Sequence, residues 1–251
     1  MITLCICLSA NAQVIFIAHR GASWDAPENT LASVNMAWAM DVEVVEIDIH
    51  LSKNNKIMVI HDDNTIRTTG EDYDVINTNS KVLRKLDAGS FKGEQFKGEK
   101  IPFLEEVIGT IPAGKKLVVE LKSRDNVLPG LKKIMKNNKK ASQLIFICFD
   151  KETIIKIKEA FPENHCYWLC SNRDFMLANI HSVAQAGLDG VGFRFSIIDE
   201  HVMELVQKLD LELFTYTVNE PDEARRLINL GVRQIATDRP EWLKNQIEKS
   251  Q

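Results

Sequence analysis

The sequence lacks long hydrophobic runs and a strong excess of charge of either sign. No run of about 18 apolar residues occurs, so we expect no transmembrane helix. The 35 acidic residues nearly balance the 31 basic ones, which gives no reason to expect nucleic acid as a partner. The densest basic stretch comprises Lys132, Lys133, Lys136, Lys139 and Lys140, and we interpret it as a solvated helix face with its exit loop. The 7 prolines and 12 glycines exclude collagen-like and disordered classes, and 251 residues suffice for one α/β barrel or two small domains.

Cysteines are few and show neither a disulfide nor a zinc pattern. They are Cys5, Cys7, Cys148, Cys166 and Cys170. If the first two are removed with a leader segment, an odd number remains in apolar surroundings, which excludes a disulfide framework. The Cys166-x3-Cys170 spacing has no second pair, so we expect no zinc site.

Residues 1–12, MITLCICLSANA, resemble the end of a secretory signal. An apolar run precedes Ala10-Asn11-Ala12, which offers the small residues that a signal peptidase cleaves after. We therefore expect a periplasmic or secreted protein whose mature chain, 13–251, is one domain. Because no Lys or Arg precedes the run, the alternative is a hydrophobic lead-in to the first strand and a cytoplasmic protein.

From Val14 onward, short β-branched runs alternate with helical patterns, as in a (β/α)8 TIM barrel. The segment between Leu51 and Lys56 is too short for a parallel crossover, so Ile57–Ile60 should return antiparallel to the strand before it. The other expected strands are Val14–Ala18, Val44–His50, Lys116–Leu121, Leu144–Cys148, Cys166–Leu169, Gly190–Phe193, Glu212–Thr217 and Gln234–Thr237. The expected helices are Thr30–Met40, Val127–Lys136, Glu152–Ala160, Phe175–Ala186, Asp199–Leu209, Asp222–Leu230 and Glu241–Lys249. Gly187 and Gly231 should cap helix ends in the left-handed conformation.

Residues 62–103 interrupt this alternation without a clear crossover helix. A structureless loop of that length is unusual in a compact domain, so we expect a small inserted segment at the barrel mouth. Leu83, Leu86 and Phe91 should give it a small core. We expect the insert to shape one side of the substrate site and to leave the chemistry at the strand ends unchanged.

Three carboxylates lie where strands are expected to approach the barrel mouth. Glu46 and Asp48 are two residues apart on one strand and therefore share a face, and Glu120 stands at the end of the next barrel strand. Without a cation they would repel and desolvate each other. Carboxylate oxygens suit Mg²⁺ or Ca²⁺ better than zinc, so we predict one such ion there.

Two histidines and two cations accompany these carboxylates. His19 and His61 follow strands and could exchange protons near neutral pH. Arg20 and Lys122 add positive charge that could bind a phosphate. A metal with these four residues indicates phosphodiester cleavage. His50 lies further along its strand and is interpreted as a rim residue.

A series of segments then identifies a family resemblance, from about Ala18 to Pro240. In order, they are HRGA, PENT, EIDIHLSKNNKIMVIHDD, TIRTTG, LDAGSF, IPFLEEV, VVELK, TYTVN and ATDRP. This series resembles the glycerophosphodiester phosphodiesterase family, with its phospholipase C-like TIM barrel and inserted segment. The resemblance implies Glu46, Asp48 and Glu120 as metal ligands, His19 and His61 as the acid–base pair, and Arg20 and Lys122 on the phosphate. It also implies hydrolysis of a small-molecule glycerophosphodiester, such as glycerophosphocholine or glycerophosphoethanolamine, to glycerol 3-phosphate and an alcohol.

Two positions depart from the family pattern near the expected mouth. Tyr216 stands where the family often has Trp, and Cys148-Phe149-Asp150 replaces Ser-Phe-Asp. Phe149, Phe193 and Tyr216 are therefore candidate substrate-mouth residues. In the segment PENT, Asn29 or Thr30 is expected to cap the first helix.

Two other functions fit the same residues. A lysophospholipase D or sphingomyelinase-D-like phosphodiesterase would need an apolar groove for an acyl chain, which Phe91, Phe193 and Phe195 could line. A non-catalytic binding barrel is the other alternative. The sequence leaves open the metal, the head group, the order of the two histidines and the oligomeric state.

Overall fold

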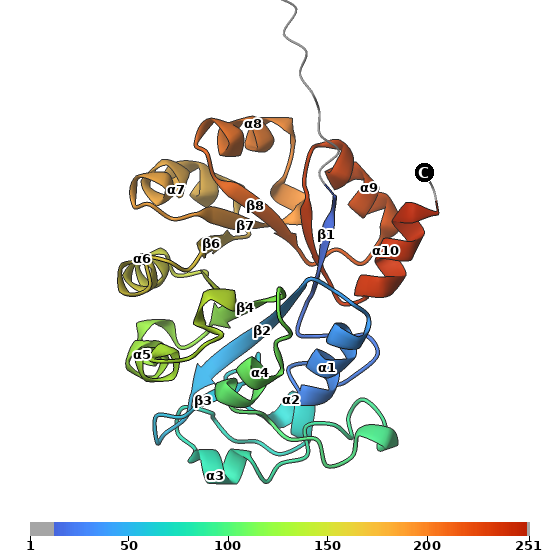
Figure 1. The fold of residues 1–251 in the computed structure, drawn as a ribbon, viewed down its shortest axis with the longest axis vertical. Coiled ribbons are helices and arrows are strands. Elements are labelled where there is room, and N and C mark those ends of the chain that lie inside the picture. The colour runs from blue at the N-terminus through green and yellow to red at the C-terminus, as the bar shows by residue number, and fades with distance from the viewer. Residues whose placement is uncertain (1–12, 250–251) are drawn as a thin grey trace, which may run out of the picture.

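Eight parallel strands close into a barrel in the computed structural model, which describes residues 13–249 (Figure 1). The strands run around the barrel in the order β1-β9-β8-β7-β6-β5-β4-β2, and β1 also pairs with β2. Their bounds are β1 Ile15–Ala18, β2 Val44–Leu51, β4 Lys116–Leu121, β5 Leu144–Cys148, β6 Cys166–Cys170, β7 Gly190–Arg194, β8 Glu212–Tyr216 and β9 Gln234–Thr237. The predicted TIM barrel is confirmed. The interpretation of residues 1–12 as a signal remnant lies outside the described residues.

The short return strand is antiparallel, as its six-residue link predicts. β3 (Ile57–Val59) pairs with β2 in the register Ile49↔Val59 and Leu51↔Ile57. This pairing carries the chain back toward the middle of β2. His61, which follows β3, therefore lies beside the strand that bears Glu46 and Asp48.

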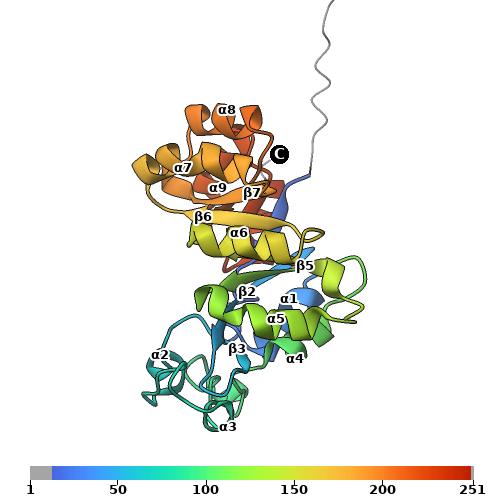
Figure 2. The ribbon, with the colours of Figure 1, turned by 90° about the vertical axis from the view of Figure 1, so that its left-hand side faces the viewer.

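Helices cover the outside of the barrel between successive strands (Figures 1 and 2). They are α1 Leu31–Ala39, α4 Leu104–Thr110, α5 Leu128–Met135, α6 Lys151–Ala160, α7 Arg173–Gln185, α8 Glu200–Lys208, α9 Pro221–Asn229 and α10 Pro240–Glu248. Thr30 caps α1, and Gly187 and Gly231 have φ angles of 73° and 102°, so these three predictions are confirmed. None of the described helices is long and apolar enough to cross a membrane. α4, which completes the crossover to β4, was not predicted.

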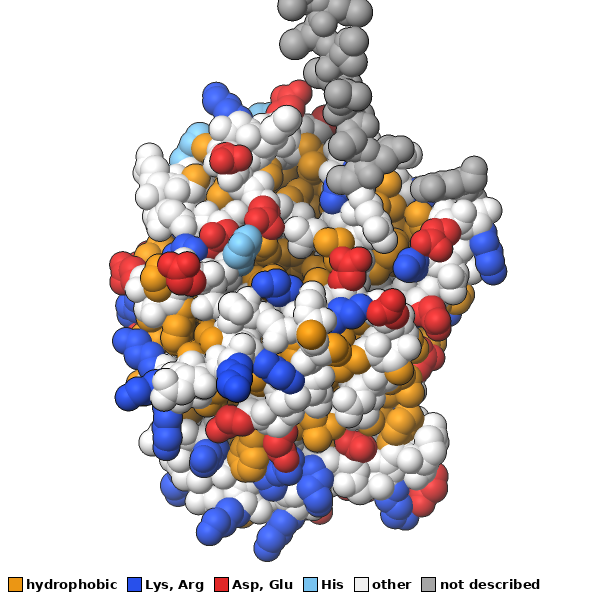
Figure 3. All heavy atoms as spheres, in the orientation of Figure 1, with side chains coloured by type: hydrophobic (Ala, Val, Ile, Leu, Met, Phe, Trp, Pro, Cys, Tyr) orange, Lys and Arg blue, Asp and Glu red, His pale blue; other side chains and the backbone are white. Residues whose placement is uncertain are grey.

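Charged side chains cover the exposed faces of the helices (Figure 3). Lys and Arg gather over α5 in this view, where Lys132 and Lys133 are exposed while Leu131 and Met135 are buried. The basic stretch is therefore a solvated helix face, as expected.

The side chains inside the barrel come from alternate strand positions. Tyr167, Leu169 and Phe214 form part of this interior cluster. A Cβ atom on Gly192 would lie 2.4 Å from the Phe214 ring, so glycine at this position makes room for it.

The same alternation corrects one prediction. Because Gly192 faces the interior, Phe193 faces outward, where it is fully buried in the layer between barrel and helices. Its ring meets Trp168 edge-on at 6.4 Å. Phe193 is therefore a core residue, and its assignment to the substrate mouth was wrong.

The insert is ordered around its own small core, at one end of the molecule in Figure 2. It contains the short helices α2 (Ile66–Thr69) and α3 (Ser80–Leu83) and a 3-10 turn at Glu94–Phe96. Leu83 and Leu86 pack with Met58 of β3 and with Ile60, which follows that strand, as predicted. Phe91 does not join them, since it is 44% exposed.

Candidate active site

A cluster of three buried carboxylates lies at the barrel mouth. Glu46 and Asp48 extend from β2 and Glu120 from β4, and the strand register places Asp48 directly opposite Glu120. One carboxylate oxygen from each residue lies within 4.8 Å of the others. The predicted carboxylates therefore meet in space.

The cluster is electrostatically unsatisfied. Burial raises the pKa of Glu46 well above its usual value, and the charges of Asp48 and Glu120 raise it further. Burial and Asp48 likewise raise the pKa of Glu120 to about 7. Glu46 Oε1 is buried and has no hydrogen-bond partner among the described residues. An acceptor-only oxygen in this position fits a hard divalent cation, so the acidic cluster could bind one.

Two cations border the carboxylates. Lys122 Nζ lies 2.6 Å from Glu120 Oε1 and 3.1 Å from Asp48 Oδ1. Arg20 Nε lies 3.4 Å from Asp48 Oδ2, and the Arg20 backbone N–H donates to Glu46 Oε2 at 2.9 Å. Burial would raise the pKa of Asp48, but Lys122 and Arg20 outweigh it and hold that pKa well below its usual value. Both predicted phosphate-binding residues thus reach the predicted metal ligands.

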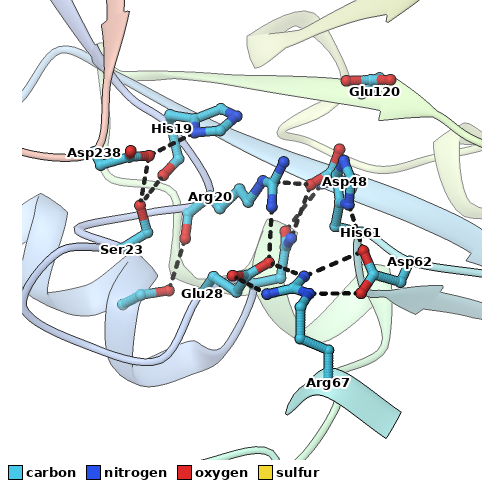
Figure 4. Close-up of polar contacts among 12 residues, drawn as sticks. His19, Arg20, Ser23, Glu28, Asp48, His61, Asp62, Arg67, Glu120 and Asp238 are labelled. Carbon is cyan, nitrogen blue, oxygen red and sulfur yellow. Dashed lines mark hydrogen bonds and ion pairs between the residues drawn. The ribbon is translucent and has the colours of Figure 1, made fainter. Parts of the chain in front are cut away.

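His19 follows β1 and pairs with a carboxylate from the other end of the chain (Figure 4). Its Nδ1 lies 2.7 Å from Asp238 Oδ1. Ser23 Oγ donates to Asp238 Oδ1 at 3.0 Å, and Asn219 Nδ2 donates to Oδ2 at 2.7 Å. Burial opposes ionisation of Asp238, but these hydrogen bonds lower its pKa to about 2.

His61 has a similar arrangement on the opposite side of Arg20 (Figure 4). Its Nδ1 lies 2.7 Å from Asp62 Oδ1. Its carbonyl lies 3.0 Å from His50 Nε2, so His50 supports the His61 backbone. Burial lowers the pKa of His61, and the charges of Lys122 and Arg20 also lower it. In both histidines Nδ1 is engaged by a carboxylate, which leaves Nε2 for proton transfer.

The segment PENT contributes more than a helix cap. Asn29 Nδ2 donates to Asp48 Oδ2 at 2.8 Å, and Asn29 Oδ1 accepts from the Asp48 backbone N–H at 3.0 Å. Glu28 Oε1 accepts from Arg20 Nη1 at 2.9 Å. Neither role was predicted, because capping of the first helix alone explained the polar residues of this segment. A helix needs only one capping residue, so the further polar residues Glu28 and Asn29 in front of α1 could have indicated a role in the site.

Asp238 was also missed, although a signal for it existed. It follows β9, so the rule that located His19 and Lys122 at strand ends applies equally to it. The contacts of Asp62 with His61 and of Arg67 with Asp62 were not predicted either.

Two pockets flank the carboxylates. One, of about 330 Å³, is lined by Glu120, Lys122, Arg124 and Phe149, among others. Phe149 is 44% exposed and meets Tyr216 edge-on at 5.9 Å, so both of these predicted mouth residues lie beside the site. The other pocket, of about 280 Å³, lies across the site, and its lining is His19, Arg20, Ser23, Trp24, Glu28, Thr217 and Asp238.

Comparisons with known proteins decide the family. The model of the glycerophosphoryl diester phosphodiesterase family matches residues 19–242. The chain belongs to this family. It is therefore an enzyme of the glycerophosphodiester phosphodiesterase class, as the sequence resemblance implied.

Individual relatives in the glycerophosphodiester phosphodiesterase family match over nearly the whole chain. The glycerophosphodiester phosphodiesterase of Caldanaerobacter subterraneus subsp. tengcongensis is 32% identical and covers 94% of this chain and 99% of its own. That of Bacillus subtilis is 29% identical and covers 91% and 85%. A solved phosphodiesterase of Oleispira antarctica, in complex with the product sn-glycerol-3-phosphate, has a TM-score of 0.84 at 29% identity and covers 93% and 96%.

Proposed function

We propose that this protein hydrolyses small glycerophosphodiesters, such as glycerophosphocholine or glycerophosphoethanolamine, to glycerol 3-phosphate and an alcohol. The observation that carries the proposal is the unsatisfied carboxylate cluster between two histidine–carboxylate pairs. The product complex of the Oleispira antarctica relative supports the same substrate class.

We further propose that Glu46, Asp48 and Glu120 hold one Mg²⁺ or Ca²⁺ ion. The unpartnered Glu46 Oε1 and the crowding of three buried carboxylates support this assignment. When bound, such an ion supplies charge that polarises a phosphoryl oxygen. Arg20 and Lys122 lie at the edge of the cluster and bind the remaining phosphate charge.

The two histidines move the protons in this proposal. Each donates its Nδ1 hydrogen to a carboxylate, which fixes the ring and the tautomer. One Nε2 accepts the proton of the attacking nucleophile, either water or the glycerol 2-hydroxyl group, and the other donates a proton to the oxygen of the departing alcohol. Attack by the 2-hydroxyl group forms a cyclic phosphodiester, which a water molecule then opens to glycerol phosphate with the two histidines in exchanged roles. Asp238 and Asp62 stabilise the charge on whichever ring is protonated.

The two flanking pockets suit a diester with two small substituents. Pockets for drug-sized ligands measure roughly 300–1,000 Å³. One of these pockets, at about 330 Å³, is near the lower limit of that range, and the other, at about 280 Å³, is just below it. A lysophospholipase D would need an apolar groove for an acyl chain. Phe193, one of the residues expected to line such a groove, is instead buried in the core. We therefore favour a water-soluble diester over a lysophospholipid.

A substrate comparison tests this proposal. Purified protein with Mg²⁺ or Ca²⁺ is given glycerophosphocholine, glycerophosphoethanolamine or lysophosphatidylcholine, and choline or ethanolamine release is measured. We expect kcat/KM to be highest for one of the two glycerophosphodiesters. A higher value for lysophosphatidylcholine would make the protein a lysophospholipase D, and absence of turnover on all three would indicate a binding role.

The location of the protein is a separate proposal. We propose that residues 1–12 act as an export signal and that the enzyme works in the periplasm or outside the cell. The support is the apolar run ending in Ala10-Asn11-Ala12.

A further inference from the structure

Arg67 lies on α2 of the insert, yet it reaches two carboxylates of the active site (Figure 4). Its Nε donates to Asp62 Oδ2 at 2.6 Å, and its Nη2 donates to Asp62 Oδ1 at 3.2 Å. Its Nη1 and Nη2 donate to the two oxygens of Glu28 at 2.7 and 2.8 Å. One guanidinium therefore binds two carboxylates in bidentate fashion, a geometry that a Lys ammonium cannot reproduce.

These contacts link Arg20 on one side of the site to His61 on the other. Glu28 also binds Arg20, and Asp62 also binds His61. Nitrogen-bearing side chains and carboxylates thus alternate along a connected row, whose members are Arg20, Glu28, Arg67, Asp62 and His61. Without Arg67, two carboxylates would face each other with no cation between them.

The two histidines differ in how their carboxylates are held. Asp238, which orients His19, accepts hydrogen bonds from Ser23 and Asn219, both outside the insert. For Asp62, the hydrogen bonds found among residues 13–249 come from His61 and Arg67. The orientation of Asp62, and therefore of the His61 ring, depends on a residue of the insert.

We infer that Arg67 is a positioning residue for hydrolysis, which acts through Asp62 to fix the ring of His61. This inference rests on the proposed function, because it assigns His61 a part in proton transfer. Arg67 itself does not contact the carboxylate cluster. Through Arg67 and Asp62 the insert also supports the catalytic centre, which revises the expectation that it shapes only one side of the substrate site.

Substitution of Arg67 should lower turnover more than substrate binding. We expect Arg67→Met to reduce kcat about 10-fold, the lower end of the effect of losing a residue that orients a histidine, with KM changed less than about twofold. Because Arg67 is 44% exposed, Tm should fall by no more than about 4 °C. Arg67→Lys should recover part of kcat, since an ammonium group can neutralise one carboxylate.

Arg84→Met is the matched control. Arg84 is also an arginine of the insert, and it binds Glu106 at 2.7 Å and the Ile101 carbonyl at 2.9 Å, with no contact to Asp62 or Glu28. We expect its kcat to equal that of the wild type. An equal loss of kcat in the Arg67 and Arg84 variants would overturn the inference, because it would show a general effect on the insert.

A double-mutant cycle with His61→Ala tests the route of the effect. If Arg67 acts through His61, adding Arg67→Met to His61→Ala should lower kcat by less than about twofold more. A further loss of about 10-fold would overturn the inference. An inactive wild-type enzyme would instead reject the proposed function, so the two failures are distinguishable.

Discussion

Removal of the metal should destabilise the protein more at high pH than at low pH. In the metal-free protein the pKa of Glu120 is raised from its ordinary 4.5 to about 7, because of burial and the charge of Asp48. Between these two values the folded protein keeps a proton that the unfolded chain loses. The stability contributed by this proton is complete below pH 4.5 and is lost as the pH rises through 7.

The magnitude follows from the difference between the two pKa values. At about 1.4 kcal/mol per pH unit, the loss amounts to about 3–4 kcal/mol over the whole range. About 2 kcal/mol of it falls between pH 5.5 and pH 8, or roughly 4–8 °C in Tm for a chain of this size. A divalent cation that binds the ionised carboxylates offsets this loss. The gap in Tm between metal-loaded and EDTA-treated protein should therefore widen from pH 5.5 to pH 8.

Thermal unfolding at several pH values, with Mg²⁺ or Ca²⁺ and with EDTA, measures this gap. Burial lowers the pKa of His50 and His61, which gives an opposite trend in absolute stability. Because metal-loaded and EDTA-treated protein are compared at the same pH, most of the contribution of the two histidines cancels. Glu120→Gln should shrink the gap and its pH dependence, whereas the exposed Glu152→Gln should change neither. A gap that is constant or narrows toward pH 8 would show that Glu120 does not hold a proton that the metal displaces.

Three further predictions follow from the site. His19→Ala and His61→Ala should each lower kcat by about 10²-fold with an unchanged circular dichroism spectrum, and near-full activity would remove that residue from the mechanism. Replacement of Thr65–Glu99 by a Gly-Ser linker should reduce hydrolysis of both glycerophosphocholine and a small activated diester, because Arg67 is lost with the insert. Loss of hydrolysis for glycerophosphocholine alone would show that the insert determines only substrate specificity. Mass spectrometry of the native protein should find no residues 1–12, and detection of Met1 would contradict the proposed export.

Much of the fold was predictable because local sequence patterns, such as β-branched runs and short links, determine the strands and their pairing. The short segment before β3 forced an antiparallel return, and the β-branched runs marked the strands. Glu46 and Asp48 could be placed on one face because strand side chains alternate. Phe193 shows the limit of this reasoning, since a glycine at position 192 leaves no side chain to mark the interior face.

The missed site residues depend on contacts between distant segments. Asp238 meets His19 across 219 positions, and no local pattern pairs them. Arg67 lies in an insert without regular periodicity, so nothing in the sequence indicates that its side chain points to Asp62. Such contacts are set by the tertiary packing of the insert against the barrel mouth.

We propose that hydrolysis of a glycerophosphodiester depends on a divalent cation held by the carboxylate cluster. The decisive measurement is ³¹P NMR of glycerophosphocholine, with wild-type enzyme treated with EDTA and then reloaded with Mg²⁺ or Ca²⁺. We predict that the glycerol 3-phosphate resonance appears with the metal, disappears with EDTA and returns on reloading, while the Glu120→Gln variant requires a higher metal concentration. Formation of glycerol 3-phosphate at the same rate in EDTA, or formation of a different phosphorus product, would contradict the account.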